Sequence, residues 1–391
     1  MTRSHATALP LGLLAVGGAG MFMSGSIGTG RAPFLLQMAG DLHVDIVVLS
    51  HMLAGSSVAV GVSSFFTGPL AGRLGRRGLL VGALVVMAAM MAGSAAASAY
   101  WQVLLAAVIG GLASGIYMGS IYGEVGDRVT DSQRGRAMGW LIGGQSLALL
   151  VGVPMASWLG AFIGWRGVSL VIGGCTAVVA GATAVLVRGG REAGTADPAR
   201  GSIRAALGPR VLALLGASIT ERICFGMLAT YFATYLQLAH HLTLGQLPVP
   251  LMLVAGCNFL GNLLGGRVTD RVANRSLLYA VAALSTGAAA VALFVPTWGI
   301  TAAVAVACVF MLVNGASRPP LFALLGGVPP QVRATVLGIN ISCASVGWML
   351  SALFGGLFVA AEAWATMGWL AAGLSLAGAV LIWIGRVRPL R

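Results

Sequence analysis

Long apolar segments, separated by short polar breaks, run through the whole sequence. Hydrophobic residues make up 58% of the chain and charged residues only 8%, which is too little charge to cover the surface of a soluble domain. A bilayer core of about 30 Å needs roughly 20 apolar residues per helix. The segments are continuously apolar, whereas barrel strands would alternate. The chain is therefore predicted to be an all-α integral membrane protein.

The apolar segments predict twelve transmembrane helices. They run over residues 9–30, 46–69, 79–98, 102–123, 138–161, 167–187, 210–237, 247–266, 276–296, 299–323, 335–358 and 365–385. Breaks on one side carry most of the 23 basic residues, all of them arginine, whereas breaks on the other side carry only Arg31 and Arg166. Because arginine-rich breaks stay in the cytoplasm, both termini are predicted to be cytoplasmic.

The longest break divides the chain into two halves. Residues 189–209 are rich in Gly, Arg, Ala and Asp and contain no apolar run, which is typical of a flexible cytoplasmic linker. The predicted organisation is a six-helix bundle over residues 1–188, the linker, and a second six-helix bundle over residues 210–391.

Two basic turns recur at half-chain spacing. The stretch from Gly68 to Arg77 leads into the third predicted span, and a related stretch from Gly266 to Arg275 leads into the ninth, 198 positions later. In both, an Arg follows the Gly after five and again after nine residues. Two parallel halves that repeat in this way are typical of transporters that rock about a midplane site.

These residues resemble the major facilitator superfamily. The stretch from Gly68 to Arg77 is similar to the family's signature loop between helices two and three, and the second turn is similar to its weaker copy. The segment from Gly144 to Pro154, followed by Trp165, is similar to helix five of the twelve-helix drug/proton antiporter branch. The resemblance covers the whole chain. It implies the family's fold, a small-molecule substrate with protons as co-substrate, and a multi-pass location in the bacterial inner membrane.

Three departures from the family's pattern stand out. The signature loop usually has an Asp where this chain has Gly72, and Val153 separates a Gly and a Pro that the antiporter motif has adjacent. The fourth helix has Ala106 and Ala107 where the branch usually has an Arg. That Arg is the family's usual proton-coupling group, so coupling here would need another residue.

Charged residues inside the spans are the main functional candidates, since each costs about 2.5–3.5 kcal/mol at a helix centre. Glu221 and Arg222 lie near the middle of the seventh span, and Arg318 lies in the cytoplasmic half of the tenth. Arg31 ends the first span, where its side chain could snorkel to the surface. Adjacent helical residues point about 100° apart, so we expect Glu221 or Arg222 to face another helix or a cavity.

Two interpretations remain open for each of the central charges. Glu221 is either the proton-binding group, because burial opposes its charged form and a nearby Arg favours it, or a member of a static ion pair. Arg318 follows Asn314 by one turn and precedes Pro319 and Pro320, which are predicted to break the helix and free carbonyls toward a cavity. It either binds a substrate or closes the cytoplasmic gate by bonding to loop carbonyls.

Further residues complete the predicted sites. Gln145, Tyr231 and Tyr235 are assigned to the substrate and proton pathway, the two tyrosines because they share a helix face. The predicted gate loops comprise Gly68, Arg73, Arg77, Asp270 and Arg271.

The first gate loop lacks the acid of the second, because Gly72 stands where Asp270 stands in the second loop. We therefore expect the first gate to rely on Arg73 and Arg77, with partners outside the turn. Removal of Arg73 is expected to impair transport more than removal of Arg76.

The sequence does not contain the motifs of other functional classes. There is no Gly-rich loop leading to Lys-Ser/Thr and no His/Cys/carboxylate cluster at metal spacing, so no cofactor, metal or catalytic residue is predicted. The net charge of +13 is explained by topology rather than by nucleic acid. The expected partners are a small molecule, protons and the lipid bilayer, with the chain as a monomer.

The predicted function is proton-coupled export of a small amphipathic molecule by alternating access. An importer or exchanger of a small organic anion is the alternative, because the arginines outnumber the acids in the spans. A non-transporting sensor or a membrane enzyme is a remote alternative, and we predict that the chain is not an enzyme.

Overall fold

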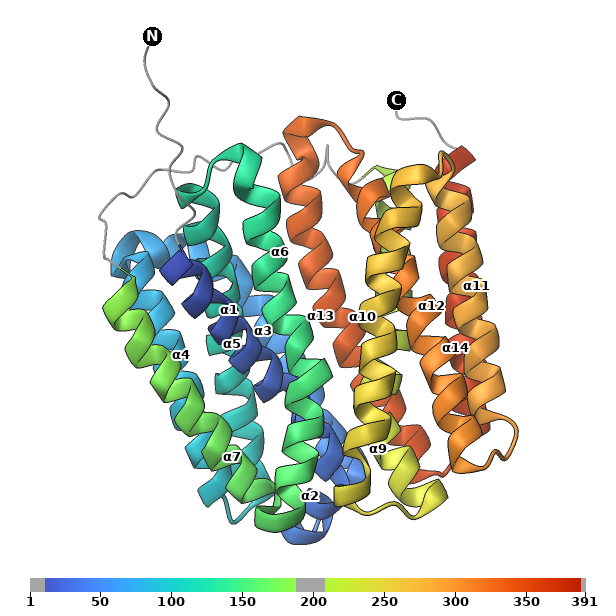
Figure 1. Ribbon diagram of the computed structural model, residues 1–391, viewed down its shortest axis with the longest axis horizontal. Coiled ribbons are helices and arrows are strands. Elements are labelled where there is room, and N and C mark those ends of the chain that lie inside the picture. Colours follow the sequence, from blue (N-terminus) through green and yellow to red (C-terminus); the bar gives the residue numbers. More distant parts are fainter. Residues whose placement is uncertain (1–10, 188–207, 388–391) are drawn as a thin grey trace.

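The computed structural model describes residues 11–187 and 208–387, and the regular elements in these ranges are all helical (Figure 1). The elements are α1 (Leu11–Thr29), η1 (Ala32–Phe34), α2 (Leu35–Leu42), α3 (Ile46–Leu74), α4 (Arg76–Ala96), α5 (Tyr100–Arg128), α6 (Asp131–Leu147), η2 (Ala148–Gly152), α7 (Val153–Leu186), α9 (Pro209–His240), η3 (Leu244–Gln246), α10 (Pro248–Arg271), α11 (Arg275–Phe294), α12 (Ile300–Gly326), α13 (Pro330–Ala360) and α14 (Trp364–Val387). The prediction of an all-α membrane protein is confirmed.

Eleven segments of the described chain are long and apolar enough to cross a membrane, and one of them is folded back on itself. That segment, Gly135–Leu186, has 52 residues and would be about 78 Å long as one helix, far more than a bilayer core of about 30 Å. Within it Gly164 has φ 65° and ψ 176°, a conformation that reverses the chain and that suits glycine. Two helices therefore meet within α7, which folds back in Figure 1. The segment supplies two spans, which brings the eleven segments to twelve spans.

Two spans contain local irregularities. The first consists of α1, η1 and α2, which together cross as Leu11–Leu42. The fifth contains the π-helical η2 just before Pro154. Proline lacks a backbone N–H and its ring crowds the carbonyl four residues earlier, which accounts for a π-bulge at that position.

The helices form two groups that lie side by side, α1–α7 and α9–α14 (Figure 1). In the first, α3 packs on α5 and α4 on α7; in the second, α10 packs on α12 and α11 on α14. The groups meet where α13 packs on α3, α10 on α7 and η2, and α9 on η1. The predicted linker, residues 189–209, lies almost entirely outside the described residues.

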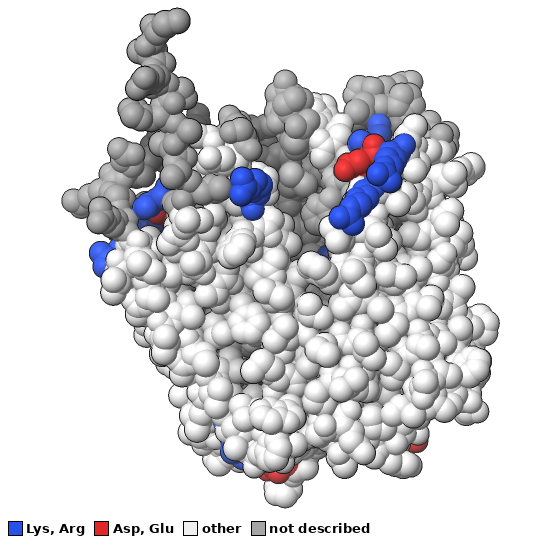
Figure 2. Space-filling view, in the orientation of Figure 1, with Lys and Arg blue, Asp and Glu red and all other residues white. Residues whose placement is uncertain are grey.

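Charged side chains gather at the two ends of the molecule, with a broad uncharged band between them (Figure 2). The α3–α4 and α10–α11 turns lie at one end, here called the basic end, where α1 begins and α14 finishes (Figure 1). Large apolar side chains such as Phe162, Val178 and Trp383 are exposed around the molecule, as a lipid-facing surface requires.

Candidate functional site

The central charged residues of the sequence meet in the structure. Glu221 on α9 accepts a hydrogen bond from Arg318 Nε on α12 at 2.8 Å, and Arg222 Nη2 lies 3.6 Å from the other Glu221 oxygen. The carboxylate is 3% exposed, and each arginine side chain is 15% exposed. As expected from helical geometry, Glu221 makes its direct hydrogen bond to another helix.

An aromatic ring and an amide complete this cluster. Arg318 lies over the Phe225 ring at 4.0 Å from its centroid, and Arg222 lies 5.5 Å from the same centroid. Cation–π contacts of this kind stabilise guanidinium groups that are partly withdrawn from water. Asn314, one turn before Arg318, lies beside the Glu221 carboxylate. Phe225 was not among the predicted residues, although it stands one turn after Glu221, a spacing that could have marked it.

The cluster carries more positive than negative charge. Two arginines face one carboxylate, and in the described part of the chain Arg222 Nε and Arg318 Nη2 are buried without a hydrogen-bond partner. Buried charges are costly unless they are paired. Protonation of Glu221 or binding of an anion would therefore change the free energy of this buried cluster. The same event at an exposed ion pair would have a smaller effect.

The prediction that Pro319 and Pro320 break the tenth span is wrong, because α12 continues through both prolines. The proline rings remove the hydrogen bonds to the carbonyls of Gly315 and Ala316. The Ala316 carbonyl lies directly against Gly265 of α10, whose lack of a side chain lets the two helices approach closely. The helix thus continues through both prolines, and α10 covers the Ala316 carbonyl.

Arg31 is separated from the cluster and does not snorkel. Its side chain is buried in the first group of helices, where Nη2 lies 3.4 Å from Ser94 Oγ and 3.7 Å from Met91 Sδ on α4. The expectation that it reaches the surface is therefore wrong.

The other predicted pathway residues occupy packing positions or lie apart from the cluster. Tyr231 is fully buried and donates a hydrogen bond to the Ala352 carbonyl of α13 at 2.6 Å. Tyr235 makes edge contacts with His240, Phe294 and Trp364.

Gln145 is half-buried on α6 and packs near Gly25 of α1.

The first basic turn finds its acids on α5. Arg76 forms ion pairs with Asp127 and, at 3.8 Å, with Glu124, which is also paired with Arg128 at 2.5 Å. Arg77 donates to the Ala184 carbonyl at 2.5 Å. The partner of Arg77 thus lies outside the turn, and Arg76, which was not among the predicted gate residues, has its partners there too.

Among the described residues, no ion pair is seen for the other predicted gate residues. Arg73 is exposed at the end of α3, and Gly68 lies within that helix. Asp270 and Arg271 are exposed at the end of α10. The described ion pairs are those of Arg76, and the expectation that removal of Arg73 impairs transport more stays a prediction.

We expect an Arg76→Gln variant to lose about 1–2 kcal/mol of stability, because Glu124 is buried and would lose one of its cationic partners. Arg73→Gln is the matched control and should change stability by less than about 0.5 kcal/mol. Thermal unfolding of the purified proteins in detergent measures both. Equal melting temperatures for the two variants would contradict the assignment.

The two groups of helices are closed at the end opposite the basic end. In the described chain, two side-chain hydrogen bonds join them: Gln237 Nε2 to the Pro33 carbonyl at 3.0 Å, and Ser157 Oγ to the Leu244 carbonyl at 2.8 Å. At the same end Gly356 of α13 packs against Ser50 of α3.

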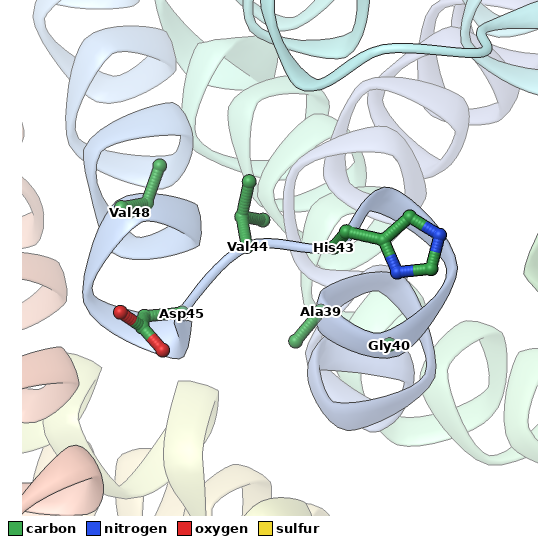
Figure 3. A pocket seen from close by; sticks show the side chains of 6 residues that line it. All are labelled: Ala39, Gly40, His43, Val44, Asp45 and Val48. Carbon is green, nitrogen blue, oxygen red and sulfur yellow. The ribbon is translucent and has the colours of Figure 1, made fainter.

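An open hollow of about 580 Å³ lies at the α2–α3 turn (Figure 3). His43 and Asp45 are its titratable lining residues, and their side chains point away from each other. Polar groups that do not converge make a poor binding site, so the Glu221 cluster is the better candidate.

Comparison with known proteins agrees with this architecture. The family model described as Major Facilitator Superfamily matches residues 14–340. The chain is 28% identical to the uncharacterized MFS-type transporter YwfA of Bacillus subtilis, over 93% of this chain and 89% of the relative. It is 25% identical to the inner membrane transport protein YdhP of Escherichia coli, over 94% of each chain.

Two further similarities are informative. A chloramphenicol resistance protein of Streptomyces lividans is 27% identical over 67% of each chain. The crystal structure of a bacterial homolog of the human lysosomal transporter Spinster, in an inward-facing and occupied conformation, superposes with a TM-score of 0.77 at 15% identity, covering 99% of this chain and 96% of that one. With a matching model over most of its length and twelve helical spans, the chain belongs to the major facilitator superfamily.

Proposed function

We propose that this transporter exports a small amphipathic molecule from the cytoplasm in exchange for protons, and that Glu221 carries the proton. The observation that supports this most is the buried carboxylate that lies between Arg318 and Arg222 in the middle part of the long helix α9. Similarity to a chloramphenicol resistance protein supports export of an amphipathic compound. The arginine-rich breaks support a cytoplasmic position for the basic end, in the bacterial inner membrane.

The coupling follows from the ion cluster. With Glu221 charged, Arg318 is held by the carboxylate. Once Glu221 is protonated, that attraction is lost and α9 and α12 are free to take another relative position. A proton and a substrate are then coupled because each binds one of two conformations better than the other.

Reconstituted vesicles with an imposed pH gradient test the proposal. With an acidic lumen and a neutral exterior, protein oriented with its basic end outward should accumulate chloramphenicol or another amphipathic compound in the lumen as protons leave. A protonophore should abolish accumulation. If a panel of amphipathic compounds moves at the same rate with and without the gradient, the exchange mechanism is wrong.

A small organic anion is the second candidate, favoured by the excess positive charge and the two unpartnered guanidinium nitrogens. An anion and the Glu221 carboxylate would compete for the same arginines. Anion binding would therefore favour protonation of Glu221, and by linkage the anion and the proton would travel in the same direction. Accumulation of a small organic anion on the alkaline side, in vesicles that contain the protein but not in protein-free vesicles, would establish this second candidate in place of the first.

A further inference from the structure

Glu221 also lines a small cavity on the side away from the first group of helices. The cavity lies among α9, α11, α12 and α14, and its volume is about 10 Å³, roughly the space that one water molecule needs. Besides Glu221, its oxygen-bearing side chains are Thr220, Tyr279, Thr286, Asn314, Ser317 and Ser375.

Four of the five hydroxyl groups around this cavity donate their hydrogens to the backbone, and the fifth, Ser375, lies 3.7 Å from Cys224 Sγ. Tyr279 donates to the Ala217 carbonyl at 3.0 Å. Three more hydroxyls donate to carbonyls of their own helices, at 3.0 Å for Thr220, 2.9 Å for Thr286 and 2.7 Å for Ser317. A hydroxyl has one hydrogen, so these four groups present only lone pairs to the cavity.

Asn314 adds a further acceptor. Its Oδ1 atom is buried and has no hydrogen-bond partner among the described residues, while its amide NH2 faces the Glu221 carboxylate. Apart from this amide and Ser375, the cavity side of the carboxylate therefore presents acceptor oxygens, whereas the other side presents Arg318. A charged carboxylate only accepts hydrogen bonds and gains nothing from such a set, whereas a protonated carboxylic acid has one O–H to donate.

We propose that this cavity receives the protonated form of Glu221. A proton taken from water binds a carboxylate oxygen, the bond from Arg318 breaks, and the new O–H donates to the oxygens of Tyr279, Thr286 or Asn314, directly or through one water molecule. Loss of the proton returns the carboxylate to Arg318. The inference rests on the proposed function, since it takes Glu221 as the proton-carrying group.

The surrounding charges determine the direction of the expected effect. The charged or titratable groups at Glu221 are Arg222 and Cys224 on α9, Arg318 on α12 and Tyr279 on α11. The described residues that α13 and α14 bring to the cluster are uncharged. The arginines favour the charged carboxylate and the cavity favours the acid, so removal of cavity oxygens should lower the proton affinity of Glu221.

The experiment is a titration of the purified protein in lipid vesicles by infrared spectroscopy, with the proton itself as ligand. The carboxylic acid C=O band that disappears in Glu221→Gln reports the protonated fraction of Glu221. In Tyr279→Phe and in Thr286→Val its midpoint should move to lower pH by on the order of 0.5–1 unit. If Tyr279→Phe does not fold, Thr286→Val decides alone.

The first group of helices offers matched controls. Tyr117 is fully buried and donates to the Val16 carbonyl at 3.3 Å, and Thr176 is fully buried and donates to the Ile172 carbonyl at 2.7 Å. Tyr117→Phe and Thr176→Val remove the same atoms far from the cavity and should leave the midpoint unchanged.

The possible outcomes separate the two proposals. If the Glu221 band titrates but Tyr279→Phe and Thr286→Val keep the wild-type midpoint, the cavity inference is overturned and the coupling role of Glu221 stands. If the spectrum has no titrating band that Glu221→Gln removes, Glu221 is not the proton carrier, and both proposals fail. Equal midpoint shifts in the controls would also overturn the cavity inference.

Discussion

Replacement of Arg318 by methionine should reduce transport by about 100-fold or more and lower the stability of the protein by about 3–5 kcal/mol. The variant keeps most of the side-chain volume but leaves Glu221, which is 3% exposed, without its direct hydrogen bond. Breaking a buried ion pair from one side costs this much because a buried charge stays behind uncompensated. Arg222 supplies only partial compensation, since its nitrogen lies 3.6 Å away.

A double-variant cycle tests the reason for this loss. Glu221→Gln combined with Arg318→Met removes both charges and should recover most of the stability, but not coupling to the pH gradient. Arg166→Met is the matched control: Arg166 pairs with Asp41 at 2.7 Å, but both side chains are 39% exposed, so the loss should stay within about 1 kcal/mol. Denaturation in detergent and vesicle transport give the two readouts. If the double variant is as unstable as Arg318→Met, the uncompensated charge is not the cause.

Replacement of Gly356 by valine should shift the protein away from the conformation described here and reduce transport by about tenfold or more. A Cβ atom at Gly356 would collide with the Ser50 side chain of α3, in the other group of helices. Ser50 lies near the start of a helix and cannot move away without moving α3. The clash therefore acts between the two groups, and the end opposite the basic end should open.

Spin labels at positions 45 and 362 measure this opening by pulsed electron resonance. Both residues are exposed at that end, on different groups of helices, and the native cysteines are replaced in all variants. The distance should lengthen in Gly356→Val. Gly373→Val on α14 is the control, because a Cβ there would meet nothing within 4 Å. An unchanged distance in Gly356→Val would show that the halves do not pack through this glycine when closed.

Much of the fold could be predicted because hydropathy acts locally. Each span is specified by its own apolar residues, and a break such as Gly164 needs only one residue able to adopt positive φ. The contact between Glu221 and Arg318 depends on how two helices pack. A charged residue inside a span needs a partner, however, and the spans contain few candidates. The spans and the cluster were therefore within reach of the sequence.

Residues whose role depends on helix rotation could not be assigned from sequence. Arg73 and Arg76 stand three positions apart in one basic turn, and the acids that distinguish them come from α5. Tyr231 looks like a cavity-lining residue until α13 is seen to pack against it. Local rules predict that the prolines of α12 break the helix, but α12 continues through them while it packs closely on α10. In each case the deciding neighbour is distant in sequence.

The closed end is held by hydrogen bonds in which neither partner carries charge. Gln237 and Ser157 each donate to a backbone carbonyl of the opposite group. Such bonds contribute only about 0.5–1.5 kcal/mol each and do not titrate. Opening at that end should therefore be nearly indifferent to the acidity and salt content of the medium it faces. If Glu221 carries the proton as proposed, the protein can respond to a difference in pH across the membrane while the hydrogen bonds of the closed end are not weakened by acid.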